Sequence, residues 1–373
     1  MGIQGLTSLL KKISPNSIIS KSLFQYKHKT IAIDTSLFIH KFMYNHGNVI
    51  NGFFHQIFLL KINKIQPVYV FDGKPPNEKN NVLKKRKKAK IDLEAKILNL
   101  ETNLHKMEQI VIHKAGISTD ANQQAGISTD AEQPIDITKK NELLEIQAKE
   151  LEIQAKELET QKKKTKKKLK QLRRQVFHIT KDDFKNIHTL FNLLNVPYYH
   201  AQGEADVLCV HLNKKNIVDA CMTEDMDFLT HGCSLLLRNF NTFNTNITEY
   251  NLKQILTDLD ITHKQFIDIC ILCGCDYTCK IKNLGPISAL KLIKEHINIE
   301  TIIEKCCGEN QKYCLPIDFD YQKARILFDG SNVELNYILH HTKEVKLIEL
   351  RNFLKQHTKM KQEQIDKKLQ MIF

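Results

Sequence analysis

Residues 203–227 read GEADVLCVHLNKKNIVDACMTEDMD, a mostly apolar stretch with carboxylates at both ends. The carboxylates are Glu204, Asp206, Asp225 and Asp227. The run IVDACM at 217–222 has the composition of a buried strand, and two of the acids lie in the loop that follows it. The stretch therefore predicts a strand whose carboxyl end carries acid.

Two earlier segments repeat this pattern. The run TIAI at 30–33 leads into Asp34, and the run PVYVF at 67–71 leads into Asp72. Nearly continuous apolar strands are typical of parallel sheets covered by helices, and ligand sites gather at the carboxyl ends of such strands. We therefore expect an α/β fold with a mostly parallel central sheet flanked by helices, and with its acids along one edge.

Acids that gather at one edge repel one another, so they take up protons or bind cations. Divalent cations that prefer oxygen ligands relieve this repulsion. Mg²⁺ in particular is held by a few carboxylates together with water and substrate phosphate. The pattern therefore predicts a magnesium-dependent site for phosphate chemistry.

Composition limits the class of protein. The chain has 373 residues, 42% of them hydrophobic, and a formal net charge of +13, which favours nucleic acid over membrane as a partner. It has no 18-residue apolar run and no signal peptide, and Leu6 stands where a myristoylation signal needs Ser or Thr. We expect an intracellular protein without a membrane partner. On charge alone, a merely soluble basic protein is the alternative.

All ten cysteines lie between Cys209 and Cys314, within apolar runs that are typical of free intracellular thiols. Four of them are close enough in sequence to suggest a zinc knot: Cys270, Cys273, Cys275 and Cys279. Their spacing does not reproduce paired C-x₂-C ligands, and their neighbours are apolar. Buried thiols are therefore the favoured reading.

Residues 77–180 have the pattern of two long helices joined by a polar loop. The first helix, at about 83–112, carries a narrow apolar seam of Leu93, Ile97, Leu100, Leu104 and Met107. The second, at about 138–175, carries Leu144, Ala148, Leu151, Ala155 and Leu158, with a literal LEIQAKE repeat. Two imperfect ten-residue repeats at 115–134 have no core pattern and predict a loop. We expect an antiparallel coiled hairpin.

Basic runs stand at both feet of this hairpin, KKRKKAK at 84–90 and KKKTKKKLKQLRR at 162–174. Residues 74–174 hold 24 Lys and Arg against 15 Asp and Glu, most of the net charge of the chain. An antiparallel hairpin brings both runs to one end, beside the acidic edge. We interpret them as a clamp for the phosphate backbone, with a solvated face or a nuclear-import signal as the alternative.

The last part of the chain begins with an apolar helix at 265–275 that ends in a seventh acid, Asp276. A turn at 280–286 follows, and Gly285-Pro286 opens the next helix, at 287–296. Free backbone N–H groups at such a helix start bind phosphate without reading sequence. We interpret this corner as a site for a DNA phosphate, with an ordinary helix-turn-helix corner of the core as the alternative.

The matching blocks for a known family are Met1-Gly2-Ile3-Gln4-Gly5-Leu6, Ala32-Ile33-Asp34, residues 68–76 (VYVFDGKPP), residues 203–206 (GEAD), residues 223–227 (TEDMD) and residues 270–277 (CILCGCDY). In this order they resemble the flap endonuclease and exonuclease 1 family of structure-specific 5′ nucleases, the XPG/Rad2-like group. The resemblance implies a PIN-like 5′ nuclease fold with a helical arch and a helix-two-turn-helix region. We place the segments of this fold at 1–76, 77–180 for the arch, 181–262 and 263–373.

The resemblance also implies site residues. Seven carboxylates would hold two Mg²⁺ ions, for which Mn²⁺ is expected to substitute: Asp34, Asp72, Glu204, Asp206, Asp225, Asp227 and Asp276. Lys79 and Arg86, seven residues apart on one helix face, would contact the scissile phosphate beside the catalytic Asp225 and Asp227. The implied DNA contacts are Gly2, His40, Lys84, Lys85, Arg86, Lys87, Lys88, Lys280, Lys282 and Gly285.

Several positions depart from the flap endonuclease pattern. His40 stands where flap endonucleases have a base-stacking Tyr. The residue types at His40, Asp206 and Cys275 are more similar to those of exonuclease 1. Lys280 replaces a side chain that helps to bind potassium, which argues against a potassium ion there. Asn283 and Ile287 replace the usual glycine and lysine of the corner. The shorter segment between the first two acids argues against the 3′-flap pocket and the hydrophobic wedge of the family.

We therefore predict a structure-specific 5′ flap endonuclease of DNA replication and repair that acts by a two-metal-ion mechanism. The alternatives are an exonuclease 1-like 5′→3′ enzyme and, from another class, a non-catalytic DNA-binding scaffold. The expected partner is DNA with a 5′ flap or a 5′ single-stranded end. Whether RNA-primed flaps are also substrates stays open. The expected place is the nucleus or a viral replication compartment. The final residues do not match the sliding-clamp tail, so clamp binding stays open.

Overall fold

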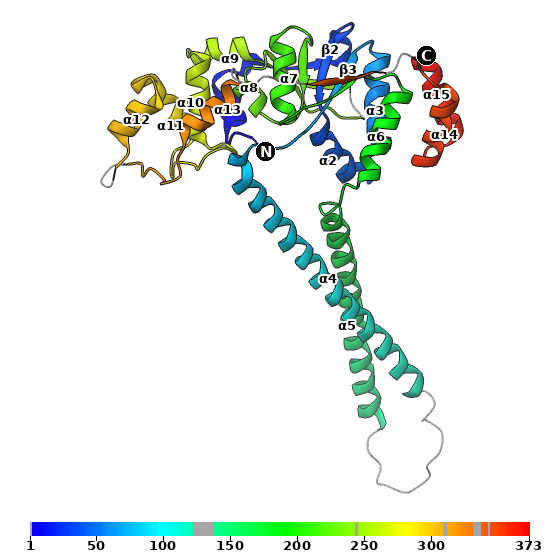
Figure 1. Cartoon of the computed structure of the whole chain (residues 1–373). Helices are drawn as coiled ribbons and strands as arrows, with labels where there is room; N and C mark the ends of the chain where they lie inside the picture. Colours follow the sequence, from blue (N-terminus) through cyan, green and yellow to red (C-terminus); the bar gives the residue numbers. More distant parts are fainter. Residues whose placement is uncertain (1, 122–136, 243–244, 309–311, 331–336, 342–343) are drawn as a thin grey trace. The chain divides into compact units, whose positions relative to one another are not determined.

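The structure, a computed structural model, describes residues 2–121, 137–242, 245–308, 312–330, 337–341 and 344–373 (Figure 1). The chain divides into two compact units. The sheet unit is Met1–Leu83 with Ile179–Phe373, and the hairpin unit is Lys84–His178. Each unit has its own packing and is described by itself.

The sheet unit is built on one eight-stranded sheet with the order β1-β7-β6-β5-β2-β3-β4-β8. The strands are β1 (Ile18–Ser22), β2 (Thr30–Asp34), β3 (Gln66–Phe71), β4 (Tyr198–His200), β5 (Ala220–Met222), β6 (Leu235–Arg238), β7 (Asn246–Asn251) and β8 (Ile338–His340). The five central strands, β6 to β4 in this order, are parallel, and β1, β7 and β8 pair antiparallel at the edges. The predicted mostly parallel α/β sheet is confirmed.

The three strands that end in acid are neighbours. β2 lies between β5 and β3, with Ile33 opposite Met222 on one side and Asp34 opposite Val70 on the other. β5 is shorter than the predicted 217–222, because the backbone turns at Asn216 and Asp219 accepts the N–H of Thr30. The carboxyl ends nevertheless lie along one edge, as expected.

Helices cover both faces of the sheet. The helices of the sheet unit are α1 (Leu6–Ile13), α2 (Thr35–His46), α3 (Val49–Ile62), α6 (Lys181–Leu193), α7 (Ala205–Lys214), α8 (Asp227–Thr230), α9 (Leu252–Leu259), α10 (His263–Cys273), α11 (Pro286–His296), α12 (Ile299–Cys306), α13 (Tyr321–Asp329), α14 (Leu347–His357) and α15 (Gln362–Ile372). Short 3-10 turns stand at Pro15–Ser17, Leu23–Tyr26 and Asn77–Lys79. Alternation along β2 sends Ile31 and Ile33 into the core under α2, α3 and α6, and Ala32 into the core under α7 and α10.

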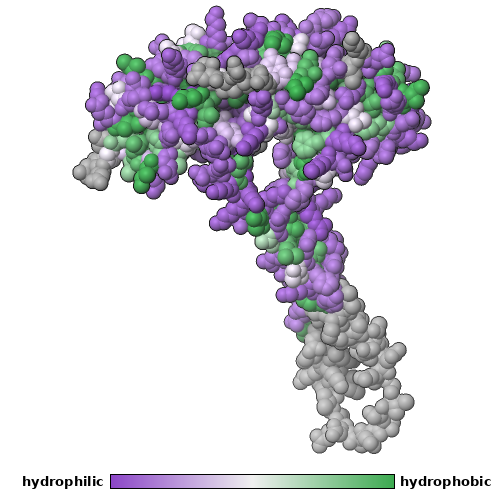
Figure 2. Space-filling view, in the orientation of Figure 1, coloured by the Kyte–Doolittle hydropathy of each residue, from purple (hydrophilic) through white to green (hydrophobic). Residues whose placement is uncertain are grey.

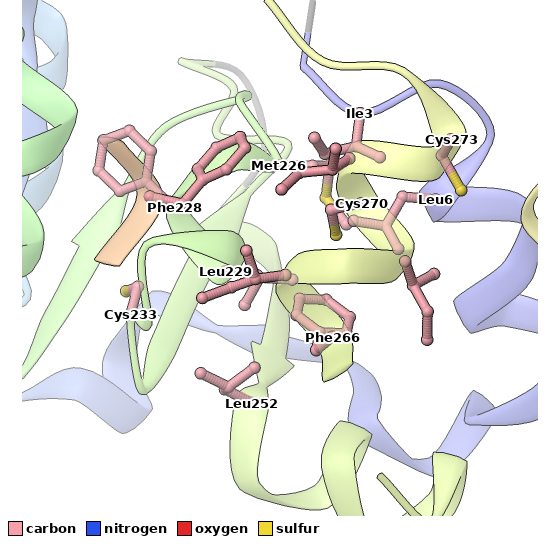
Figure 3. Close-up of a cluster of buried hydrophobic side chains, with 14 of the residues drawn as sticks. Ile3, Leu6, Met226, Phe228, Leu229, Cys233, Leu252, Phe266, Cys270 and Cys273 are labelled. Carbon is pink, nitrogen blue, oxygen red and sulfur yellow. The ribbon is translucent and has the colours of Figure 1, made fainter. Parts of the chain in front are cut away.

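The second of these cores joins the N-terminus to the acidic loop. Ile3 and Leu6 lie in one buried cluster with Met226 and Cys270 (Figure 3). Cys270 is fully buried among apolar side chains, as predicted for a free thiol, whereas Cys279 is exposed. The start of the chain, the loop after β5 and the end of α10 are therefore held by one set of apolar contacts.

The hairpin unit consists of most of α4 (Asn80–Ala121) and of α5 (Ile137–Arg173). The two helices are antiparallel: Glu108 lies 3.1 Å from Lys166, Glu101 2.6 Å from Arg173, and Lys90 Nζ donates to the carbonyl of Phe177. α4 extends through Ala121, so the first seven residues of the predicted repeat loop are helical, while 122–136 lie outside the described residues.

The apolar seam of the hairpin can be compared with its prediction at all five positions on α4 and at two on α5. On α4, all five predicted seam residues are half-buried, and most of the residues between them are exposed. On α5, Leu158, Leu169 and Leu172 are covered, whereas Ala155 is exposed; the side chains of Leu144, Ala148 and Leu151 lie outside the described set. The described seam of α5 therefore runs through the basic segment, and the side chains around it are hydrophilic (Figure 2).

Among the described residues, none of the helices combines the length and the apolar character that a membrane crossing requires.

Candidate active site

The loop after β3 brings Asp72 to the start of α7. Asp72 Oδ1 accepts the N–H of Ala205 at 2.7 Å, and the N–H of Gly73 donates to the carbonyl of Gly203 at 2.6 Å. A side chain on Gly73 would overlap the carbonyl oxygen of Ala201, so this crossing needs glycine. The backbone thereby fixes Asp72 beside Glu204, which precedes α7, and Asp206 in its first turn.

The loop after β5 is held by a chain of hydrogen bonds. Thr223 Oγ1 donates to Asp34 Oδ2 at 3.1 Å and accepts the N–H of Asp225 at 3.2 Å. Asp225 Oδ1 in turn accepts the N–H of Asp227 at 3.1 Å. Asp34 also caps α2, because its other carboxylate oxygen accepts the N–H of Leu37 at 3.3 Å. Three of the seven predicted acids are thus linked through one threonine.

Gly2 closes the site from the N-terminal side. Its φ is +85°, and a Cβ there would overlap Asp225 Oδ1 and lie 2.9 Å from Asp227 Oδ1. Further along, the N–H of Gln4 donates to the carbonyl of Gly274 at 3.3 Å, and Gly5 lies against Pro286. The first residues therefore run between the acidic loop and the corner that joins α10 to α11.

Lys79 places a cation among the acids. Its Nζ makes a short ion pair with Glu204 and lies 3.8 Å from Asp276 Oδ2. Tyr277, next to Asp276, donates its hydroxyl to Glu204 Oε2 at 2.9 Å. The last of the seven acids, at the end of α10, is thereby tied to the carboxylates of α7.

The carboxylates perturb one another strongly. Burial raises the pKa of Asp34 to about 8, and Asp72 and Asp206 add to this shift. Burial also raises the pKa of Asp227 far above its ordinary value, with further contributions from Asp225, Asp206 and Asp276. In both cases neighbouring acids favour the neutral form, which shows that the acids share one electrostatic environment.

Two further acids of the cluster follow the same trend, and one does not. Burial raises the pKa values of Asp225 and Glu204, and the charge of Asp206 contributes to both shifts. Burial acts on Asp206 in the same direction, but interactions with His231 and Lys79 outweigh it and lower its pKa. The pKa of Asp206 is thus lowered among neighbours whose pKa values are raised.

Divalent cations fit this donor set. Asp227 Oδ1 is buried and has no hydrogen-bond partner among the described residues, although a buried carboxylate oxygen is costly unless something pairs with it. Carboxylate oxygens are the ligands that Mg²⁺ prefers. No three described His, Cys, Asp or Glu side chains already converge on a single point as metal ligands.

The structure gathers the seven predicted acids, Lys79 and Gly2 in the sheet unit. Arg86, Lys84, Lys85, Lys87 and Lys88 belong to the hairpin unit, and the structure does not place them with the acids. Their roles stay predictions.

The remaining predicted DNA contacts lie in the sheet unit. His40 and Lys282 are exposed, and Gly285 precedes α11. Lys280 Nζ donates to Gln4 Oε1 at 3.1 Å, and its stem packs on Gly274. Their contacts with DNA also stay predictions.

Sequence reasoning missed the residues that support the acids. Thr223 and Tyr277 are adjacent in sequence to predicted acids, so their positions offered a signal. His231, which is buried 3.6 Å from Asp206, offered none, because the contact depends on how α8 packs against α7 and α13.

Two family models match the chain. The XPG N-terminal domain matches residues 1–92, and the XPG I-region matches residues 195–276. These ranges contain all seven acids. The XPG N-terminal domain also contains Gly2, Lys79 and Arg86.

Relatives match over most of their length. The chain is 30% identical to flap endonuclease 1 of Tetrahymena thermophila, over 98% of this chain and 88% of the relative. It is 31% identical to flap endonuclease 1 of Danio rerio, over 90% of this chain and 78% of the relative.

Solved structures share the fold. The catalytic core of Rad2 in complex with DNA substrate aligns with a TM-score of 0.64 at 19% identity, over the whole of both chains. Flap endonuclease-1 from Methanococcus jannaschii aligns with a TM-score of 0.60 at 19% identity, over 100% of this chain and 98% of that one. The family models, the relatives and the fold agree: the chain belongs to the flap endonuclease group of the XPG family, whose members are structure-specific nucleases.

Proposed function

We propose that this chain hydrolyses DNA phosphodiester bonds next to a junction between duplex and 5′ single strand. The observation that carries the proposal is that four acids at or after the ends of β2, β3 and β5 lie with Glu204 and Asp206 at the start of α7 and Asp276 after α10, where burial and neighbouring acids raise the pKa values of Asp34 and Asp227. A protein that only bound DNA would gain nothing from buried like charge. The name of the relatives, flap endonuclease 1, agrees with this reaction.

We expect two Mg²⁺ ions, replaceable by Mn²⁺, to be held by these acids. One ion would be held by Asp225, Asp227, Glu204 and Asp206. The other would be held by Asp72 together with Glu204 or Asp206. Water ligands of the ions would be oriented by Asp34 and Asp276. Bound there, the ions would activate a water and stabilise the leaving oxygen of an in-line displacement. The unpaired Oδ1 of Asp227 supports this assignment.

Lys79 would offset phosphate charge as it develops in the transition state. Its ammonium already lies between Glu204 and Asp276, where acids surround it. A substrate phosphate that enters this site would meet a cation whose stem is fixed by its packing. We propose that Arg86, one turn into the hairpin unit, adds a second cation, and that the basic feet of the hairpin guide the 5′ strand.

Duplex DNA would be held at the corner between α10 and α11. The first N–H groups of α11 are free of intrahelical partners, and Gly285 and Lys282 leave the corner accessible. Lys280 is fixed on Gln4 and Gly274, so it would supply positive charge at this corner without a potassium ion. Both features contact the phosphate backbone and select structure rather than sequence.

An exonuclease 1-like activity is the second candidate. The observation that favours it is His40, which is exposed on α2, the helix that Asp34 caps. A histidine there replaces the base-stacking tyrosine expected of flap endonucleases. Product length separates the two: an endonuclease releases the flap as an oligonucleotide, and an exonuclease releases mononucleotides.

We further propose that the substrate is DNA with a 5′ flap and that the protein acts where DNA is replicated, in a nucleus or a viral replication compartment. Activity on RNA-primed flaps stays open. Binding to a sliding clamp stays open.

The test is Asp225→Asn, assayed on a 5′-labelled flap substrate in Mg²⁺ and in EDTA. We expect cleavage to fall by at least about 10³-fold, because the lost carboxylate would be a ligand of the cation that stabilises transition-state charge. Binding of the flap substrate should be unchanged or tighter, since one repulsive charge is removed. Equal Mg²⁺-dependent turnover by the variant would contradict the proposal and favour a scaffold.

Asp219→Asn is a matched control. Asp219 lies before the same strand, at the opposite edge of the sheet, where it pairs with Lys29 at 2.8 Å. The Asp219→Asn variant should cleave the flap substrate at the wild-type rate.

A further inference from the structure

His231 is a buried histidine that the proposed mechanism does not use. It follows α8, is 2% exposed, and its backbone N–H donates to the carbonyl of Asp227 at 2.8 Å. It therefore lies one turn beyond a predicted metal ligand and inside the core.

Both ring nitrogens of His231 face oxygen atoms. Nδ1 lies 3.2 Å from the carbonyl oxygen of Phe328, in α13. A carbonyl only accepts, so Nδ1 carries a hydrogen and donates it; Nε2 donates towards the Asp206 carboxylate only when it carries a hydrogen as well. Nε2 lies 3.6 Å from Asp206 Oδ2 and has no hydrogen-bond partner among the described residues. The ring thus spans the gap between α13 and α7.

Aromatic packing limits the motion of the ring. The His231 ring lies 5.1 Å from that of Phe328 and 6.5 Å from that of Tyr277, measured between centroids. With the Phe328 carbonyl fixed at one end, Nε2 has little freedom to turn away from Asp206. The contact is therefore built by three elements that are far apart in sequence.

Asp206 is restrained from both sides. Its Oδ1 accepts the N–H of Val207 at 2.7 Å, and its Oδ2 faces His231. The carboxylate thus has a defined orientation at the start of α7, beside Glu204. Groups behind a ligating carboxylate commonly set its orientation, and their removal typically lowers metal affinity about 10- to 100-fold.

We propose that His231 is a positioning residue: it orients the Asp206 carboxylate for a divalent cation, and the Phe328 carbonyl orients His231. The inference rests on the proposed function, because it requires a cation at the carboxylates. It makes α13, in the C-terminal part of the chain, a determinant of cation affinity at a site formed by the sheet edge and α7.

Three substitutions separate the two ends of the ring. In His231→Gln the amide nitrogen can take the place of Nε2 and donate towards Asp206. In His231→Asn it takes the place of Nδ1 and donates to Phe328 alone. His231→Phe fills the volume and donates to neither.

The experiment measures Mn²⁺ affinity of the DNA-free full chain by isothermal titration calorimetry, and the thermal midpoint in EDTA. We expect His231→Phe and His231→Asn to bind Mn²⁺ about 10- to 100-fold more weakly. His231→Gln should stay within about threefold of the wild type, which a purely structural role would not produce. If His231→Phe fails to fold, the comparison of Gln with Asn decides by itself.

His263→Phe is the matched control. His263 Nε2 lies 3.3 Å from the carbonyl oxygen of Leu229, so this variant removes a similar ring-to-carbonyl contact that involves none of the seven acids. It should bind Mn²⁺ like the wild type.

The outcomes separate the inference from the proposed function. Wild-type Mn²⁺ affinity that persists in a folded His231→Phe, or that falls equally in His231→Gln and His231→Asn, would overturn the positioning role alone. A wild-type chain that binds no Mn²⁺ would overturn the proposed function, and this inference with it.

Discussion

The acidic edge of the sheet unit and the basic feet of the hairpin unit hold their charges in different ways. At the acidic edge, backbone N–H groups bind the acids directly: Ala205 donates to Asp72, and Asp227 donates to Asp225. In the hairpin, Lys84, Lys85, Lys87 and Lys88 are exposed on a helix whose packing is a narrow seam.

The difference teaches what each region is suited to do. Acids fixed by short backbone contacts keep their positions, so a small displacement should cost reactivity. Exposed lysines act through the number of charges, so they should contribute affinity that salt weakens. The two regions therefore call for different perturbations.

Of the changes that test this comparison, Gly2→Ala should have the largest effect, because it tests the precision of the acidic edge. The new methyl group would overlap Asp225 Oδ1, and φ +85° is strained for any residue with a Cβ. Displacement of reacting groups by about 1 Å costs about 10²-fold in rate, which is the fall in flap cleavage that we expect.

Gly330→Ala is the control for Gly2→Ala. Gly330 also has a positive φ, +59°, but a Cβ there would meet its nearest heavy atom at 3.8 Å, an ordinary contact. This variant should lose some stability and keep its cleavage rate. Equal cleavage by Gly2→Ala and the wild type would show that the acidic edge tolerates displacement, and would break the comparison.

Replacing Lys84, Lys85, Lys87 and Lys88 together by Gln tests the hairpin. Each lysine that contacts a phosphate adds about 0.9 to the slope of log affinity against log salt, so we expect the slope to fall by roughly 2 to 4 and binding to weaken roughly tenfold near 0.15 M salt. Fluorescence anisotropy with a labelled flap substrate in EDTA measures both quantities.

A matched quadruple variant carries the same charge change elsewhere. Lys27, Lys64, Lys215 and Lys253 are exposed near the amino ends of the parallel strands, away from the acidic edge. Their replacement by Gln should change the slope by less than about 1. Equal effects of the two variants would mean that net charge, and not the hairpin, binds the DNA.

The central fold was predictable because its signal is local. An apolar run followed by acid occurs at Asp34, Asp72 and Asp225, and each run forms a parallel strand. The edge strands were not predicted, because their pairing joins distant segments of mixed polarity; Ile18 of β1 pairs with Tyr250 of β7. Such strands gain their stability from neighbours that the local pattern does not name.

The same distinction holds in the candidate site. The acids stand in short motifs, so their residue types and spacing predicted them. His231 and the carbonyl of Phe328 are brought together by helix packing, and a histidine near an apolar run has no pattern that announces this contact. On α5 the LEIQAKE repeat placed the predicted seam at residues 144–158. Glu101 and Glu108, beside the predicted seam of α4, instead pair with Arg173 and Lys166, which lie nearer the end of α5.

The smallest expected effect concerns stability. It tests whether the repulsion between the acids at the acidic edge destabilises the fold when no cation is bound. The folded pKa of Asp34, about 8, lies above its ordinary value of 3.8. Protonation of Asp34 therefore stabilises the fold, fully below about pH 4, and this stabilisation is lost as the pH rises to about 8. In EDTA, the thermal midpoint should fall over this range by about 1–3 °C, the shift expected of 1–2 kcal/mol in a protein of this size.

Asp34→Asn isolates this contribution from the other groups that titrate in the same range. The amide is neutral at every pH and nearly isosteric, so its midpoint should fall less between pH 5 and pH 8 than that of the wild type. With Mg²⁺ present, the wild-type midpoint should fall less over this pH range than that of Asp34→Asn, because a bound cation stabilises the ionised carboxylate. Mg²⁺ should raise the wild-type midpoint most near pH 8. Parallel curves for both proteins in EDTA would show that the acids are not strained, and that the order of the edge comes from the hydrogen bonds of its loops alone.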